Sequence, residues 1–156
     1  IENTEGNFHF YREGSPPKVA SVTQKVDEER MRVANTLKVR TISFVEYFYK
    51  AGYTSQRAMQ EKSVYYALMD SEVNREIRAP NRLRHRFIEE DVEFGLVPFS
   101  SLGKEYGVAT PTIDSLIHLA SLINEADYWK EGATIEKLGL ARLSLEKLHD
   151  FLYHGY

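Results

Sequence analysis

The side chains that could support chemistry concentrate in one stretch, HRFIEEDVEFGLVPF, at residues 85–99. A histidine and an arginine precede three adjacent acids, Glu89, Glu90 and Asp91, and an apolar run follows them. A carboxylate held beside apolar walls could orient a histidine and stabilise its protonated form, which is the supporting role of an acid in acid–base catalysis. A solvated helix start would explain the same acids, because the backbone dipole favours negative charge there.

Five arginines lie just before the acids and offer a second kind of chemistry, at positions 75, 78, 82, 84 and 86. One guanidinium could clamp a carboxylate ligand through its planar fork. Several could contact phosphates, but nucleic-acid binding favours a basic domain, and this chain has a net charge of −3. A salt-bridged surface is the third interpretation, with His85 paired to Glu89 and Arg86 to Glu90 at helical spacing. We therefore expect no nucleic-acid partner.

The 156 residues offer less support for a cysteine, nucleotide or metal site. The chain has no cysteine, and its nine glycines form neither a GxGxxG nor a Walker pattern. His85 and Glu89 would supply only two metal ligands, and the other histidines make no second pair, so we expect no bound metal. No apolar run approaches the roughly 20 residues needed to cross a bilayer. We therefore expect a soluble, cytoplasmic protein with no membrane partner.

The elements that position these residues are predicted to be helices, because apolar residues recur at helical spacing along most of the chain. The clearest case is a long amphipathic helix that starts at GSPP and runs to Leu37. Further helices are expected over 44–51, 55–69, 71–79, 98–106, 111–123, 134–138 and 144–154. Three of these have suitable N-caps, namely Thr41 or Ser43 for the first, Thr54 or Ser55 for the second, and Thr110 for the helix at 111–123. The alternation in NFHFY at 7–11 predicts a short N-terminal strand or hairpin.

The fold class is therefore all-α, a multi-helix bundle-like domain that occupies the whole of residues 1–156. A kink is expected directly after the acids. Gly95 would permit a positive φ or a close backbone approach, and Pro98 would start a new helix. This kink would hold Asp91 in place beside the apolar run.

Four segments share their order and spacing with a known family. They are IENTEGNFHFYREG at 1–14, IRAP at 77–80, EDVEFGLVP at 90–98 and ATPTID at 109–114. Together they resemble the alpha-helical C-terminal domain of the octopine/nopaline (opine) dehydrogenases. The resemblance implies a helical fold like that of the 6-phosphogluconate dehydrogenase C-terminal domain.

The resemblance also implies an oxidoreductase that acts on CH–NH groups. Enzymes of this family join an N-terminal Rossmann domain to a helical domain and bind the substrates between them. They condense an amino acid with an α-keto acid reductively, using NAD or NADP, and run the reverse oxidation. We therefore expect a Rossmann domain upstream of Ile1 in the same polypeptide, which would hold most of the cofactor.

Two residues match positions of the family's site. Asp91 matches the aspartate of a catalytic Asp/His pair, and Arg86 matches an arginine that meets a substrate carboxylate. The catalytic histidine would fall a little upstream of Ile1, so none of the five histidines should inherit its role. The chain alone is thus expected to be catalytically incomplete.

A different class of function stays open at this point, namely a helical interaction or small-molecule-binding module that kept the fold without the reaction. The polypeptide before Ile1 separates the two, because only the enzyme requires a Rossmann domain there. The sequence does not choose the amino acid, the keto acid, or NAD over NADP. It also leaves a homodimer open, because the apolar helix at 111–123 could serve as a dimer face as readily as a core.

Overall fold

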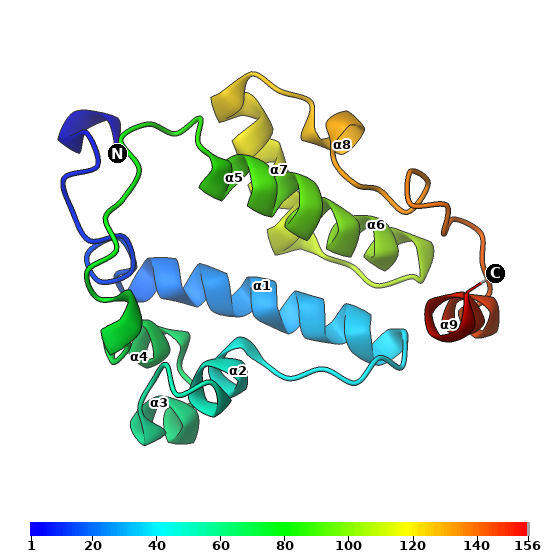
Figure 1. Ribbon diagram of the computed structural model, residues 1–156. Helices are drawn as coiled ribbons and strands as arrows, with labels where there is room; N and C mark the ends of the chain where they lie inside the picture. Colours follow the sequence, from blue (N-terminus) through cyan, green and yellow to red (C-terminus); the bar gives the residue numbers. More distant parts are fainter. Residues whose placement is uncertain (156) are drawn as a thin grey trace.

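One long helix with shorter helices on two sides makes up the computed structural model, which describes residues 1–155 (Figure 1). The long helix, α1 (Pro17–Thr36), is about 30 Å long. On one side of it lie α2 (Phe44–Lys50), α3 (Gln56–Glu61) and α4 (Val64–Met69). On the other side lie α5 (Arg86–Asp91), η3 (Val92–Leu96), α6 (Val97–Glu105), α7 (Pro111–Asn124) and α8 (Tyr128–Glu131).

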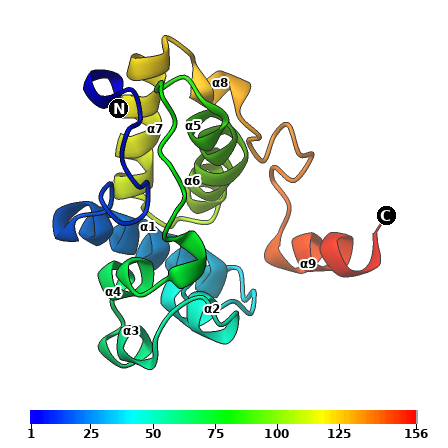
Figure 2. The ribbon, with the colours of Figure 1, turned by 60° about the vertical axis from the view of Figure 1, so that its left-hand side comes forward.

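The remaining elements lie near the two ends of the chain. The last helix, α9 (Leu145–His154), lies beside the C-terminal end of α1 and stands apart from the other helices in both ribbon views (Figures 1 and 2). Two 3-10 turns, η1 (Glu2–Thr4) and η2 (Glu72–Asn74), complete the described elements. The expected all-α class is confirmed. None of the described helices has the length and hydropathy of a membrane-spanning segment.

The core consists of three apolar clusters, and α1 contributes to each of them. Ala20 packs with buried residues of α2, α3 and α4. Val26 packs against a cluster built from η3, α6, α7 and α8. Val33 and Leu37 pack with Leu148 of α9. The long helix therefore joins parts of the chain that are far apart in sequence, as its regular apolar spacing predicted.

Serine side chains cap the N-termini of several helices. One of these caps lies inside a segment that the sequence predicted to be a continuous helix. Ser43 and Ser55 cap α2 and α3 as expected, with Oγ accepting from the backbone N–H of the third residue on. The predicted helix at 55–69 is wrong as a single helix, because Lys62 takes a left-handed conformation with a φ of 49°. Ser63 then caps α4 and starts a new helix.

The predicted N-terminal strand at 7–11 is wrong. Within the described residues this segment forms one isolated antiparallel bridge, between His9 and Arg78. The Phe10 N–H donates to the Ile77 carbonyl at 2.8 Å, and the chain then turns, with the N–H of Glu13 donating to the His9 carbonyl at 2.9 Å. Alternation alone could not make a strand, because the partner segment pairs over too short a length.

Two of the expected short helices are also wrong. Residues 71–79 contain only the three-residue turn η2, and residues 134–138 form turns. A short helix that the sequence analysis missed, α8, begins instead at Tyr128. The Asp127 carboxylate caps it by accepting from the Lys130 N–H at 3.2 Å.

The expected kink after the acids is wrong as well. The backbone continues from α5 through the π-helical turn η3 into α6 without a break. Gly95 lies in this turn with a φ that is not positive, and a Cβ there would meet open space. Pro98 lies in the first turn of α6 and has no N–H to offer the residue 94 carbonyl, so the wider π winding accommodates it.

Candidate functional site

A hollow of about 490 Å³ lies between α1, the α5–η3 segment and α7. Most of its lining is aliphatic, and Asp91 and Thr23 supply the polar groups. The lining residues are Val19, Val22, Thr23, Val26, Asp91, Leu96 and Leu116. A hollow of this size with few polar groups is typical of small-molecule sites.

Asp91 is the last residue of α5, and its carboxyl group borders the hollow while staying open to solvent. Partial burial beside the aliphatic wall raises the pKa of this carboxyl, and the adjacent charge of Glu90 raises it further. Within the described residues, the Asp91 side chain makes no hydrogen bond and no ion pair. Its carboxylate is therefore available to a group that the described residues do not supply.

Tyr11 is a neighbour of Asp91 that the sequence analysis did not single out. Its hydroxyl has a raised pKa, first because it is half-buried and then because the Asp91 charge lies nearby. The Tyr11 ring meets Phe10 edge to face at 5.1 Å, and Phe10 in turn lies 5.5 Å from Phe87 of α5. These aromatic contacts hold the N-terminal segment against α5. The run of aromatic residues in FHFY was the available signal.

Arg86 lies at the other end of α5 from Asp91. The two residues are five positions apart, which places them about 140° apart around an ideal helix. Arg86 is exposed, lies outside the lining of the hollow, and has its guanidinium 6.0 Å from the Phe87 ring centre. Arg86 is thus accessible to solvent on the same helix as Asp91, but the structure does not bring the two side chains together. Its role as a clamp for a substrate carboxylate stays a prediction.

The ion pairs expected within α5 are wrong. His85 is the N-cap of this helix, where its Nδ1 accepts from the Phe87 N–H at 3.2 Å. Glu89 pairs with Arg84 instead, at 3.4 Å. Helical spacing alone did not anticipate this, because His85 has the extended backbone of a cap. Arg86 and Glu90 form no ion pair in the part of the chain that the structure describes.

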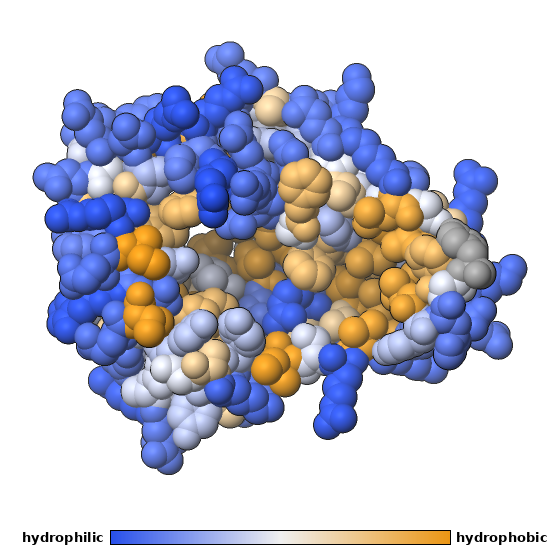
Figure 3. All heavy atoms as spheres, viewed as in Figure 1, coloured by the Kyte–Doolittle hydropathy of each residue, from blue (hydrophilic) through white to orange (hydrophobic). Residues whose placement is uncertain are grey.

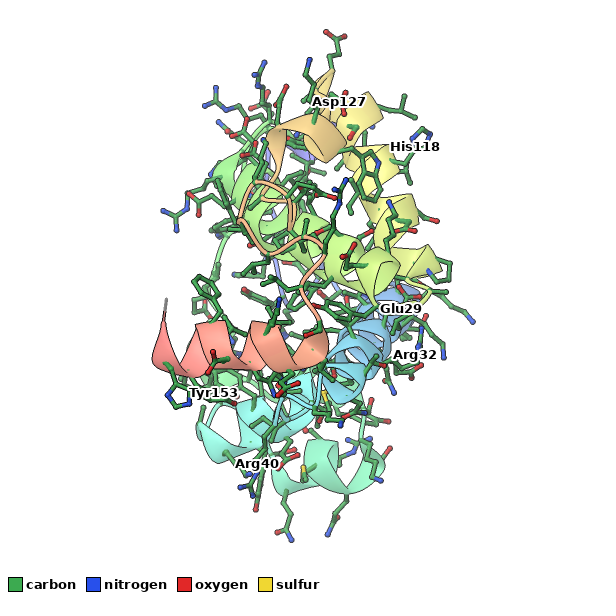
Figure 4. All side chains as sticks on the ribbon, turned by 90° about the vertical axis from the view of Figure 1, so that its right-hand side faces the viewer. Glu29, Arg32, Arg40, His118, Asp127 and Tyr153 are labelled. Atoms are coloured by element: carbon green, nitrogen blue, oxygen red, sulfur yellow. The ribbon has the colours of Figure 1, made fainter. Side chains whose placement is uncertain are left out.

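None of the histidines in the described residues pairs with the Asp91 carboxylate. His9 pairs with Glu13 at 2.8 Å, and the Nε2 of His149 donates to the Leu37 carbonyl. His118 is exposed on the outer side of α7 (Figure 4). In the part of the chain that the structure describes, no three His, Asp or Glu side chains gather as a metal site would require.

A second carboxylate, Glu29, is buried where α1 meets α7 (Figure 4). Its two oxygens accept from the backbone N–H groups of Thr112 and Ile113, both at 2.9 Å. Burial raises the pKa of this carboxyl, but these two N–H groups and the nearby Arg32 lower it by more, so the net shift is downward. Glu29 therefore serves as the cap of α7.

This arrangement corrects the expected role of Thr110. Its side chain does not cap α7 but donates to Asp114 at 3.1 Å. Because Glu29 holds the start of α7 against α1, it also fixes the position of Leu116, which forms one wall of the hollow. No local pattern indicates this cap, since 83 positions separate Glu29 from Thr112.

Comparison with known proteins identifies the family. The model described as "NAD/NADP octopine/nopaline dehydrogenase, alpha-helical domain" matches residues 1–124. The chain therefore belongs to the alpha-helical domain family of the octopine/nopaline dehydrogenases.

Individual relatives agree with this assignment. Opine dehydrogenase from Arthrobacter sp. (strain 1C) is 39% identical over 137 residues, which cover 88% of this chain and 37% of the relative. Protein ocs from Agrobacterium tumefaciens (strain Ach5) is 27% identical over 134 residues, covering 84% and 35%. The chain thus spans little more than a third of the length of these curated relatives.

Part of a solved structure of octopine dehydrogenase with NADH and L-arginine has the same fold as this chain. The TM-score is 0.60 and the sequence identity 18%, over 90% of this chain and 40% of the other. At this identity the match concerns the fold alone. It agrees with the all-helical architecture described above.

Proposed function

We propose that this chain is the helical substrate-binding and catalytic domain of an opine dehydrogenase-like oxidoreductase. The enzyme would condense an amino acid with an α-keto acid reductively, using NAD or NADP, and would run the reverse oxidation. Membership of the family supports this function. The observation that carries it is the carboxylate of Asp91, which borders an apolar hollow and has no partner among the described residues.

The proposal assigns the cofactor to another domain. The described residues form no sheet, and the chain has no glycine fingerprint, so they do not fit a dinucleotide-binding site. We therefore infer a Rossmann domain in the same polypeptide, with residues 1–156 as the helical domain. The cysteine-free sequence is compatible with the cytoplasm, and this location is part of the proposal.

In this proposal Asp91 interacts with the histidine that transfers the proton and does not contact the cofactor. Its carboxylate would accept a hydrogen bond from a histidine of the upstream region and stabilise the charged form of that imidazole. The aliphatic wall strengthens the attraction, because charges interact more strongly away from water. Arg86 would bind a substrate carboxylate, for which its exposed guanidinium is free of ion pairs with described residues.

The test uses the polypeptide that carries this chain together with its upstream region. Oxidation of NADH and NADPH is followed with a panel of amino acids combined with pyruvate or 2-oxoglutarate. Asp91→Ala is expected to lower kcat by about 10²- to 10⁴-fold, the range of an acid–base contribution. The melting temperature should not fall, because the Asp91 side chain makes no hydrogen bond or ion pair within the described fold.

Glu90→Ala is the matched control, since it removes the neighbouring carboxylate that does not line the hollow. It should leave kcat within a few-fold of the wild-type value. If Asp91→Ala turns over as fast as Glu90→Ala, the assignment of Asp91 is wrong. If no pair of substrates oxidises either cofactor, the enzymatic function is overturned in favour of a non-catalytic binding module.

A further inference from the structure

The outer face of α7 is apolar, although the described residues leave it exposed to solvent. We propose that the C-terminal half of this face is the docking surface for the upstream domain of the same polypeptide. Docking there would set that domain over the mouth of the hollow beside Asp91. The inference rests on the proposed function, because the upstream domain and the histidine that it carries belong to that proposal.

α7 is apolar on almost every side. Ile113 and Ile117 are buried on its inner side, in the core shared with η3, α6 and α8. Leu119, Leu122 and Ile123, which we call the α7 patch, are 51%, 64% and 48% exposed. A helix that is hydrophobic on all sides is normally buried on all sides. The α7 patch is therefore expected to be covered in the complete protein.

The outer face has few groups that favour contact with water. The nine residues 116–124 contain no Asp, Glu, Lys or Arg, whereas 28% of the chain is charged. Asp114, the one carboxylate of α7, accepts hydrogen bonds from Ser100 and Thr110 and so lies toward α6. His118 projects outward (Figure 4). Single exposed apolar residues are common anywhere, but a contiguous uncharged group of them marks an interaction surface.

The α7 patch continues into the mouth of the hollow. Leu116, Leu119 and Ile123 follow one another at intervals of three and four residues, so they lie in one row along α7. Leu116 is also a wall of the hollow, across from exposed valines of α1. A partner seated on this row therefore also reaches the mouth that Asp91 borders. The proposed histidine of the upstream region must approach Asp91 from there.

The entry point of the chain favours the upstream domain as the occupant. In both ribbon views the N-terminus lies on the same side of the molecule as the C-terminal end of α7 (Figures 1 and 2). In two curated relatives the matched residues make up 37% and 35% of the length, so most of such a protein lies outside the helical domain. A domain tethered at Ile1 has an effective concentration on the order of 1 mM, with which a second copy of the chain would have to compete.

The first experiment places a photo-cross-linker beside the α7 patch in the full-length protein. His118 projects from this face, so His118→p-benzoylphenylalanine puts the reactive group next to Leu119 and one helical turn from Leu122. We expect a cross-link at the mass of a single molecule, to a peptide upstream of Ile1. A product of twice that mass would place a second copy on the patch and overturn the proposal. A product that joins two parts of residues 1–156 would overturn it as well.

The second experiment needs no variant. Hydroxyl-radical footprinting of the full-length wild type compares Leu122 with Leu138, which has the same side chain and lies in the turns at 134–138. The exposures of 64% and 49% in the helical domain predict faster labelling of Leu122. Docking reverses this order, and Leu122 should be labelled about fivefold more slowly, because the core of an interface excludes water. Labelling of Leu122 at the rate of Leu138 or faster would overturn the docking surface.

A double variant, Leu119→Glu with Leu122→Glu, links docking to turnover. Both side chains are exposed, so the fold should survive, as circular dichroism would check. The two carboxylates should abolish the cross-link from position 118 and lower kcat/KM by about 10- to 100-fold, because a misplaced catalytic group loses its alignment. Leu138→Glu is the matched control and should change neither. A folded double variant with an unchanged cross-link and unchanged kcat/KM would contradict the proposal.

The outcomes separate this inference from the proposed function. An intramolecular cross-link to the upstream region, in a protein that turns over no pair of substrates, would overturn the proposed function and leave the docking surface standing. Turnover without this cross-link and without protection of Leu122 would overturn the docking surface and leave the proposed function standing.

Discussion

Two of the hollows that line α1 differ in one chemical respect. The hollow at the N-terminal half of α1 has aliphatic walls and the carboxylate of Asp91. The hollow at the C-terminal half has a volume of about 240 Å³ and entirely apolar walls, formed by Val33, Ala34, Leu37, Val39, Phe99, Leu102, Leu140, Leu148 and Leu152. Figure 3 shows hydrophobic residues gathered between α1, α6 and α9, where this second hollow lies.

Concavity and apolar walls alone therefore do not define a site for chemistry. The second hollow lies under α9, which is attached mainly through its first half. Leu148 is 2% exposed, whereas Leu152 is 55% exposed and Tyr153 is 71% exposed and projects from the helix (Figure 4). We interpret this hollow as incomplete packing beneath a terminal helix. The first hollow has a charged group that can act on a ligand.

Leu148→Ala is expected to change the stability of the fold more than any other variant considered for the two hollows. The substitution enlarges the second hollow and removes the buried anchor of α9, so unfolding should become easier by about 2–5 kcal/mol. Thermal or urea denaturation followed by circular dichroism measures this loss. Below the melting transition, kcat/KM should stay near the wild-type value. A loss of turnover in a folded Leu148→Ala enzyme would contradict the division of roles between the hollows.

Glu29→Gln is expected to have the next largest effect, because Glu29 ties α7 to α1 and so supports the first hollow. Glutamine can accept only one of the two backbone N–H bonds and turns a donor toward the other, which should cost about 1–3 kcal/mol. Chemical denaturation at neutral pH measures the loss. Stability equal to that of the wild type would show that the cap contributes nothing.

The same pair of proteins tests the pH dependence of this cap. The pKa of Glu29 is lowered on folding, so its contribution should be fully present above the ordinary value of 4.5 and lost as the pH falls through the folded pKa. The stability difference between wild type and Glu29→Gln should therefore shrink on acidification below pH 4.5. A difference that grows with acid would mean that the shift has the opposite sign.

Arg86→Lys should have a smaller effect, confined to substrate binding. Lysine keeps the charge but replaces the planar fork with a point charge, so KM for one carboxylate substrate should rise about tenfold. Steady-state kinetics with each substrate varied in turn measures this change, and Arg82→Lys serves as the control from the same arginine-rich segment. Unchanged KM values for both substrates would remove Arg86 from the site.

The smallest effect is expected from Ala34→Leu, which places a larger side chain at the wall of the second hollow. Filling this space should stabilise the fold by about 0.5–1 kcal/mol without changing turnover. A small rise in the melting temperature is the expected readout, with Ala51→Leu at an exposed position as the control. Destabilisation by Ala34→Leu would show that the space is narrower than its volume indicates.

Local patterns in the sequence were sufficient for the features that local physics decides. The spacing of apolar residues predicted α1, and Ser43 and Ser55 predicted two helix starts, because the interacting groups lie within one helical turn of each other. The all-α class followed from the same patterns. The four quoted segments indicated the family. This resemblance rests on the identity and order of residues, so it can be recognised without knowing the tertiary structure.

Other features depended on contacts that no local pattern records. The strand expected at 7–11 became a single bridge, because its partner lies near Arg78. The helix expected at 55–69 was divided by the conformation of Lys62, and η3 replaced the expected kink at Gly95.

The helical class, the long helix, the family and the choice of Asp91 as the candidate carboxylate thus follow from the sequence. The packing of the helices was needed to show that Asp91 borders an aliphatic hollow, that Arg86 lies outside its lining, and that Glu29 caps α7. The physical reason is that a hollow is a property of several helices at once. Its walls come from residues 19 to 116, and their distances are fixed only when α1, α5, η3 and α7 pack together.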